Sequence, residues 1–279
     1  MLRRVILSVI FIPIIIYIIY ADFLNSLLLF LFVLLLSFFT SKEMYILLKR
    51  IYKFQSADNR SAVWFYLPGA VIIIIYYINT FFKVNLLFIL YTAGFTVFSI
   101  FLHAVIQKVT GKGISSFLIL LVSYIYTGIF PLIIFIIKQE NNRIFVLYLL
   151  FLLGWFNDAA AYFIGSFFGR IKGIIKWSPN KSLEGYSGAF ILTIAVGLAL
   201  RFVFGERFPF NGIQTALICL VIAVCAPLGD LFESMAKRKA GMKDSSNFLP
   251  GLGGVLDIFD SILMSAPVYY ILLRIFFSV

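Results

Sequence analysis

Charged side chains are scarce in this sequence, and apolar side chains dominate it. Charged residues make up 13% of the 279 residues, whereas hydrophobic residues make up 62% and aromatic residues 18%. A soluble domain of this length would not expose so few charges, so the composition excludes an ordinary soluble protein. It predicts an all-α polytopic membrane protein.

Cysteine and histidine are nearly absent. Cys219 and Cys225 lie six residues apart in one apolar run and face different sides of a helix, which excludes a disulfide framework and a cysteine metal site. We interpret both as small buried hydrophobic residues. His103, the single histidine, lies within an apolar run and is interpreted as a packing residue.

About nine apolar stretches approach the roughly 20 residues that a bilayer requires. The first has the pattern of a signal peptide, but its length and the poor cleavage site at 20–22 favour a retained span. The amphipathic segment 42–56 is predicted to lie at the membrane interface, with its lysines on head groups. The nine stretches are roughly 5–21, 23–39, 63–82, 85–106, 114–137, 144–168, 187–204, 212–233 and 257–277.

The net charge is +11, and the basic residues behind it are unevenly distributed along the chain. In a membrane protein, such basic residues face anionic lipid head groups and anionic substrates rather than nucleic acid. With the N-terminus inside, 17 of the 23 Lys and Arg residues fall in inside segments. The positive-inside rule therefore predicts an N-in, C-out topology.

The densest group of charges lies in residues 230–260, between apolar stretches, and such charge beside a bilayer indicates a functional site. If a helix starts after Gly253 and Gly254, Asp257 and Asp260 lie at positions i and i+3 on one face. Two carboxylates this close repel each other unless a cation lies between them. Oxygen ligands suit Mg²⁺, and Asp230 offers a third carboxylate.

Basic residues and glycines accompany these aspartates. The run Lys237-Arg238-Lys239, together with Lys243, suits anionic groups, and Gly253-Gly254 lets backbone amides approach a phosphate. The alternative is a solvated cytoplasmic loop that obeys the positive-inside rule. That alternative explains the lysines, but not the paired aspartates or the glycines.

A second polar group begins with Asp158, a lone carboxylate in an apolar stretch, which shares a helix face with Tyr162. The alternative is that Asn157 and Asp158 form a hydrogen-bonded pair that joins helices. Further along, Lys181 and Glu184 lie three residues apart, and Ser182 is predicted to cap a short helix.

Both stretches resemble the phosphatidate cytidylyltransferase (CDP-diacylglycerol synthase) family. Leu252 stands where the family has His, and Ile258 where it has Arg. The two motifs occur in the family's order, about 70 residues apart. The matching positions are Asp158, Ala161, Tyr162, Gly165, Phe168, Gly169, Arg170, Ser178, Pro179, Lys181, Ser182, Glu184, Gly185 and Gly188 in the first motif, and Ser234, Lys237, Arg238, Lys243, Asp244, Ser246, Leu249, Pro250, Gly253, Gly254, Asp257 and Asp260 in the second.

The resemblance implies transfer of a cytidylyl group from CTP to phosphatidate, giving CDP-diacylglycerol and pyrophosphate for phospholipid biosynthesis. The resemblance covers roughly residues 150–270. We expect N-terminal membrane helices over 1–140 and a catalytic membrane region over 141–279, and the charge asymmetry puts its loops 169–186 and 234–256 at the cytoplasmic edge of the cell membrane. The implied partners are CTP, phosphatidate and membrane lipid, without nucleic acid, and a homodimer is left open. The implied catalytic residues are Asp230, Asp257, Asp260, Lys237 and Arg238, the three aspartates being the Mg²⁺ ligands, and the implied substrate-binding residues are Asp158, Tyr162, Lys181, Ser182, Glu184, Lys243, Asp244, Gly253 and Gly254.

Three alternative functions stay open. A CTP-dependent lipid kinase would act on an alcohol and favour a nearby base, which the sequence does not show. A transporter or channel would place its ionisable residues near mid-membrane at helix breaks, whereas most of these lie at the cytoplasmic edge. A divergent or inactive homologue that serves as a lipid-binding scaffold is favoured by Leu252 and Ile258.

The charge asymmetry predicts that the loops 169–186 and 234–256 face the cytoplasm. Cysteines introduced at Lys176 and Lys239 should react with an impermeant thiol reagent only when the cytoplasmic side is opened. A cysteine at Arg207, which the same topology places outside, is the matched control. Labelling at Lys176 or Lys239 from outside alone would contradict the topology.

Overall fold

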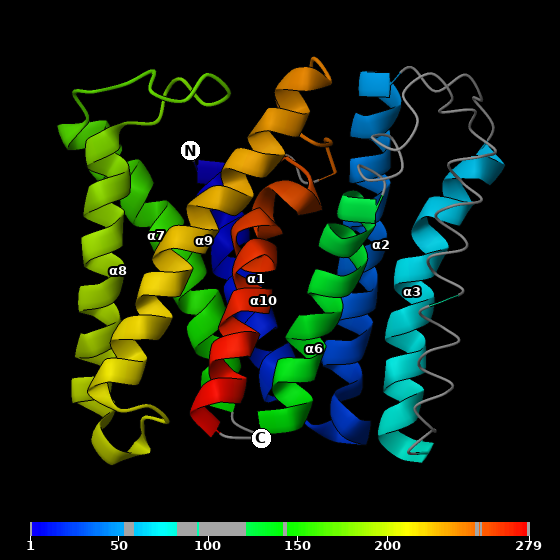
Figure 1. Cartoon of the computed structure of the whole chain (residues 1–279), viewed down its shortest axis with the longest axis horizontal. Helices are drawn as coiled ribbons and strands as arrows, with labels where there is room; N and C mark the ends of the chain where they lie inside the picture. The colour runs from blue at the N-terminus through cyan, green and yellow to red at the C-terminus, as the bar shows by residue number, and fades with distance from the viewer. Residues whose placement is uncertain are drawn as a thin grey trace. The chain divides into compact units, whose positions relative to one another are not determined.

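The structure is a computed structural model, and it describes residues 2–52, 59–82, 94, 121–141, 144–248, 251 and 253–277. These residues form helices joined by loops, and no strand is found among them (Figure 1). The elements are α1 (Leu2–Tyr20), α2 (Phe23–Tyr52), α3 (Asn59–Phe82), the π-helix η1 (Ile125–Ile129), α6 (Phe130–Asn141), α7 (Ile144–Phe168), α8 (Leu183–Phe204), the 3-10 helix η2 (Gly205–Arg207), α9 (Gly212–Lys239) and α10 (Val255–Phe277).

Seven helical segments of the described residues are long and apolar enough to cross a membrane, so the chain is an all-α polytopic membrane protein. The predicted span at 85–106 lies outside the described residues except for residue 94, and His103 lies outside them as well. The apolar helix Phe11–Tyr20 is shorter than the other seven segments. The count of nine spans and the N-in orientation stay predictions. The seven segments are Phe23–Tyr52, Phe65–Phe82, Leu121–Gln139, Ile144–Phe168, Leu183–Arg207, Gly212–Lys239 and Val255–Phe277.

The prediction of a separate interfacial helix at 42–56 is wrong for its described part. Residues 42–52 continue α2, which has left-handed backbone angles at Leu24, Asn25 and Ser26 and is helical from there to Tyr52. Met44 and Leu47 are buried, and so is the carboxylate of Glu43, at 3% exposure. Because Met44 and Leu47 are covered by other parts of the protein, the apolar face of this segment is not available to lipid.

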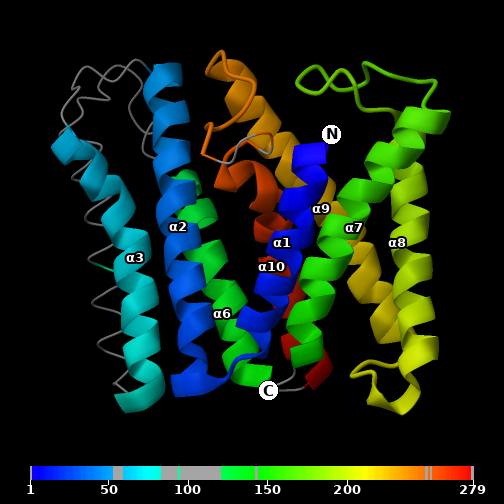
Figure 2. The same cartoon turned by 180° about the vertical axis from the view of Figure 1, so that it is seen from behind.

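Contacts divide the chain into two units. Unit 1 consists of Met1–Ile136 and Lys239–Ile258, and unit 2 consists of Ile137–Arg238 and Phe259–Val279. In unit 1, α2 packs along α3 and against η1 (Figure 2). The ring of Phe30 in α2 stacks on that of Tyr77 in α3, with 4.0 Å between the ring centroids.

In unit 2, α7 and α8 lie side by side in both views (Figure 1 and Figure 2). A Cβ atom added to Gly185 would lie 2.8 Å from the Ala161 carbonyl oxygen, so only glycine permits this close approach. Buried Asn157 accepts a hydrogen bond from the Thr193 hydroxyl at 3.1 Å. Asn157 therefore joins two helices, as the alternative for this residue proposed, but its partner is Thr193 in α8.

Candidate active site

Three carboxylates of unit 2 converge on one point. Asp230, Glu233 and Asp260 each offer an oxygen, and these oxygens lie within 4.8 Å of one another. Glu233 is 1% exposed and Asp260 is 4% exposed. Asp230 and Glu233 lie three residues apart in α9, which puts them on one face of that helix, opposite Asp260 of α10.

Gly229 brings these two helices together. A Cβ atom at this position would lie 2.8 Å from the carbonyl carbon of Asp260 and 2.9 Å from Cβ of Met264. The α9 backbone therefore rests directly on the α10 backbone, and Asp230, the next residue, meets Asp260.

Two ammonium groups face the carboxylates. Lys181, from the loop between α7 and α8, forms an ion pair with Asp230. Lys237 donates a hydrogen bond to Oε2 of Glu233 at 2.7 Å, one helical turn away. Partial burial lowers the pKa of Lys181, while the negative charges of Asp158 and Asp260 oppose that shift.

The charges around Lys181 and Lys237 do not balance. Among the described residues, four carboxylates face two ammonium groups, which leaves a formal excess of two negative charges when all four are ionised. The four carboxylates are those of Asp158, Asp230, Glu233 and Asp260. Such an excess is unfavourable away from water. A divalent cation would neutralise it, and the oxygen-only donor set fits a hard metal ion. This group of six side chains is called the acidic cluster below.

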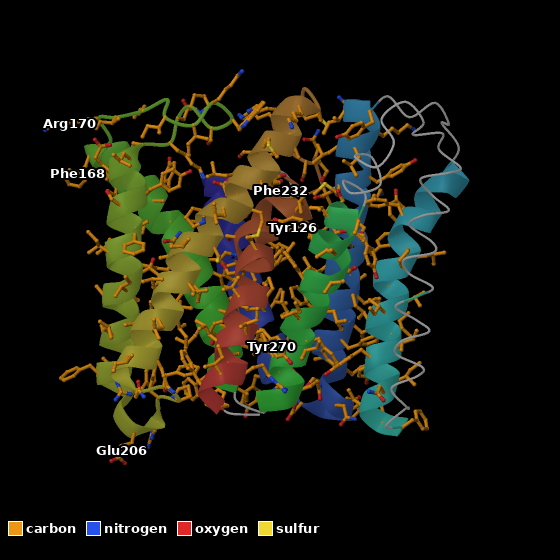
Figure 3. The ribbon with its side chains drawn as sticks, in the orientation of Figure 1. Tyr126, Phe168, Arg170, Glu206, Phe232 and Tyr270 are labelled. Carbon is orange, nitrogen blue, oxygen red and sulfur yellow. The ribbon has the colours of Figure 1, made fainter. Side chains whose placement is uncertain are left out.

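The loop that carries Lys181 is held by side chains of the first motif. Ser182 is the N-cap of α8 and accepts a hydrogen bond from the Gly185 amide at 3.1 Å, which confirms the predicted cap, although the helix has 22 residues and is not short. Glu184 accepts from the Ile171 amide at 3.1 and 3.2 Å. This loop lies at the end of α8 marked by Arg170, and Glu206 marks the opposite end (Figure 3).

Asp257 belongs to unit 1. Its Oδ2 accepts hydrogen bonds from the Ser245 amide at 2.8 Å, from the Ser245 hydroxyl at 2.7 Å and from the Gly254 amide at 2.7 Å. Gly253 has a φ of +94°, a conformation that favours glycine. In this geometry Asp257 caps its own helix and closes the preceding loop, and its role as a metal ligand stays a prediction.

Three other residues of the second motif are exposed. Arg238 in unit 2 and Lys243 and Asp244 in unit 1 face outward, as does Tyr162 of α7 at 61% exposure. Ile258 is half-buried, and Leu252 lies outside the described residues.

Sequence reasoning missed Glu233 as a site residue. Its spacing held the signal, because Asp230, Glu233 and Lys237 follow one another at steps of three and four along α9. Three charged residues on one stripe of a membrane helix indicate a polar interior.

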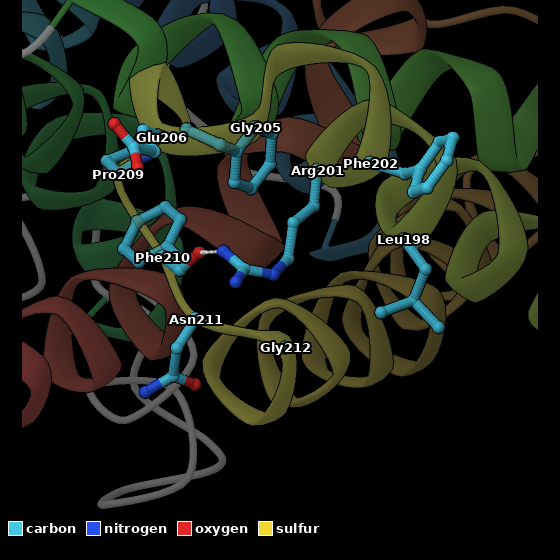
Figure 4. A pocket seen from close by; sticks show the side chains of 10 residues that line it. Leu198, Arg201, Phe202, Gly205, Glu206, Pro209, Phe210, Asn211 and Gly212 are labelled. Carbon is cyan, nitrogen blue, oxygen red and sulfur yellow. Dashed lines mark hydrogen bonds between the residues drawn. The ribbon is translucent and has the colours of Figure 1, made fainter.

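Unit 2 also has a hollow of about 820 Å³ at the other end of α8 (Figure 4). The Arg201 guanidinium within it donates to the Phe210 carbonyl oxygen. No predicted site residue lines this hollow, so it is separate from the acidic cluster. Its lining residues are Leu198, Arg201, Phe202, Gly205, Glu206, Phe208, Pro209, Phe210, Asn211 and Gly212.

The sequence matches the cytidylyltransferase family over residues 2–276, so the chain belongs to this family of nucleotidyltransferases. It is 44% identical to a phosphatidate cytidylyltransferase of Bacillus subtilis over 122 residues, which cover 44% of this chain and 45% of the relative. Identity to the enzyme of that name from Staphylococcus haemolyticus is 37% over 153 residues, 55% of this chain and 57% of the relative. Identity to the phosphatidate cytidylyltransferase of Thermotoga maritima is 41% over 124 residues, which cover 43% of this chain and 46% of the relative. The chain thus aligns with about half the length of these relatives.

Replacing Gly229 by alanine should disturb the acidic cluster, since the added methyl group meets the α10 backbone. We expect a loss of about 1–3 kcal/mol in the free energy of unfolding, the usual cost of overpacking. Unfolding in detergent measures this, and Mn²⁺ binding measured in parallel should weaken. Gly212→Ala, at the more open start of the same helix, is the control and should change neither.

Proposed function

We propose that this protein transfers the cytidylyl group of CTP to phosphatidate, forming CDP-diacylglycerol and pyrophosphate. The acidic cluster carries the proposal: a membrane chain of the cytidylyltransferase family holds buried and half-buried carboxylates and lysines from both motif regions in one group. The names of its relatives agree with this reaction.

The reaction requires little from acids and bases. The nucleophile is a phosphate oxygen of phosphatidate, which is already ionised at neutral pH. It attacks the α-phosphorus of CTP, the bond to the β-phosphate oxygen breaks, and pyrophosphate leaves. The protein has to align two anions and reduce their repulsion. Lys181, Lys237, Arg238 and Lys243 are the cations proposed for this task.

We assign Mg²⁺ to Asp230, Glu233 and Asp260, and keep Asp257 as a candidate ligand. When bound, the ion supplies Lewis-acid stabilisation of phosphate charge. Lys237 fixes one oxygen of Glu233, and Lys181 neutralises part of the charge of Asp230. Asp158 adds negative charge next to Lys181 and helps to keep its amine protonated.

The proposed place of this reaction is the cytoplasmic edge of the cell membrane. The charge asymmetry of the sequence supports this orientation. Substrate delivery fits it as well, because CTP is a cytoplasmic solute and phosphatidate a membrane lipid.

Neutralising the cluster should abolish turnover. We expect Asp260→Asn and Glu233→Gln each to lower CDP-diacylglycerol formation from labelled CTP by about a hundred-fold or more, as when one electrostatic contact to a transition state is removed. The control is Glu206→Gln at the far end of α8. Asp257→Asn should also abolish turnover if Asp257 is a ligand. Near-normal activity in the cluster variants would refute the metal assignment.

The same assay separates the alternatives. A CTP-dependent lipid kinase would release CDP and a phosphorylated alcohol instead of CDP-diacylglycerol. A lipid-binding scaffold would retain phosphatidate but form neither product.

The departures from the family pattern predict a slow enzyme. Leu252 and Ile258 donate no hydrogen bond to a phosphate, and one lost bond to a charged group costs about 1.5–3 kcal/mol. That is about ten- to a hundred-fold per site. We therefore expect the double variant Leu252→His with Ile258→Arg to turn over faster than the parent. A fast parent that the double variant does not improve would mean that other residues have replaced the lost donors.

A further inference from the structure

Glu43 has a hydrogen-bond environment that the proposed reaction does not use. Its Oε1 accepts from the Ser246 hydroxyl at 2.7 Å and from the Val255 amide at 3.0 Å. Its Oε2 accepts from the Ser245 hydroxyl at 2.8 Å and from the Leu256 amide at 2.7 Å. Each oxygen thus has two donors, all of them in unit 1.

These four donors belong to two parts of one segment. Ser245 and Ser246 lie in the middle of the loop 240–254, and Val255 and Leu256 begin α10. The first amides of a helix have no partner within the helix, and its positive end attracts anions. Glu43 supplies the acceptor from α2, more than 200 residues earlier in the chain.

Gly254 shows how tightly the carboxylate fits. A Cβ atom at this position would lie 2.6 Å from the carboxylate carbon of Glu43. The amides of Gly254, Val255 and Leu256 are all occupied by Asp257 or Glu43. The glycine therefore makes room for an internal carboxylate, and these three amides are not available to a nucleotide phosphate.

We infer that Glu43 is a positioning residue, which fixes residues 243–248 of this loop and the start of α10 in the conformation that serves the substrate. The inference rests on the proposed function, because this loop carries Lys243 and Asp244, whose side chains face outward. Glu43 acts on the reaction through the loop and contacts no reacting atom. The loop meets the nucleotide through its side chains, since its last amides are engaged.

The variants Glu43→Ala and Glu43→Gln test this role. Alanine removes all four hydrogen bonds, and glutamine turns one acceptor oxygen into a donor that faces other donors. We expect kcat/KM for CTP to fall about ten-fold or more, the effect of losing one or more hydrogen bonds to a charged group. The KM for phosphatidate should stay unchanged. Lys42→Gln, an exposed neighbour in the same helix, is the control and should behave as the parent.

Hydrogen exchange distinguishes positioning from a general loss of structure. In Glu43→Ala the peptide covering 245–256 should exchange faster, while peptides from α7 and α8 keep the parental rate. Adding Ser246→Ala to Glu43→Ala should cost no further activity, because the bond between them is already lost.

The outcomes separate this inference from the proposed function. Unchanged exchange in 245–256, or full activity with CTP, would overturn the role of Glu43. A parent protein that forms no CDP-diacylglycerol would instead contradict the proposed function, and the exchange measurement would still decide whether Glu43 holds the loop.

Discussion

The contact of α9 with α10 at Gly229 is the constraint on which the acidic cluster depends. Because no side chain separates the two backbones there, Asp230 and Glu233 come to lie beside Asp260. The same closeness gathers negative charge in a site with little water. Lys181 and Lys237 offset part of that charge, so the proposed cation site depends on the packing of these two helices.

Five of the carboxylates described above differ in their hydrogen-bond donors. Glu43, Glu184 and Asp257 accept hydrogen bonds from backbone amides and thereby fix loops and a helix start. Asp230 and Glu233 instead face ammonium groups and each other. A carboxylate saturated by amides is a poor metal ligand, whereas one paired with a lysine keeps a lone pair available. In the proposed function this difference favours Asp230 and Glu233 as metal ligands and makes Asp257 the weaker candidate.

The sequence predicted the fold class and part of the candidate site. The other features could not be predicted, for a physical reason. Hydropathy predicted an all-α membrane protein, and local spacing predicted the cap at Ser182. Asp230 was predicted as a carboxylate of the site, whereas Glu233, three residues later on the same helix, was not. The ion pair of Lys181 with Asp230 and the bonds of Glu43 to the loop 240–254 join residues far apart in the chain, and no local pattern encodes such contacts. For Glu43, the amphipathic pattern of 42–56 pointed to lipid, because a periodic pattern does not reveal whether its partner is lipid or protein.

Helix α2 connects an exposed apolar segment to the loop 240–254 through Glu43. The helix exposes Leu31, Leu35 and Phe38 along its earlier turns and holds Glu43 in a later one. When the hydrophobic length of a helix differs from the thickness of the bilayer by a few ångströms, the helix tilts or shifts. Either movement changes the depth of its residues in the membrane. If α2 crosses the bilayer, a thinner or thicker membrane would move Glu43 and the residues bonded to it relative to the plane in which lipid phosphates lie. Acyl-chain length would then act on the segment that Glu43 is inferred to position, even without a contact to the chains themselves.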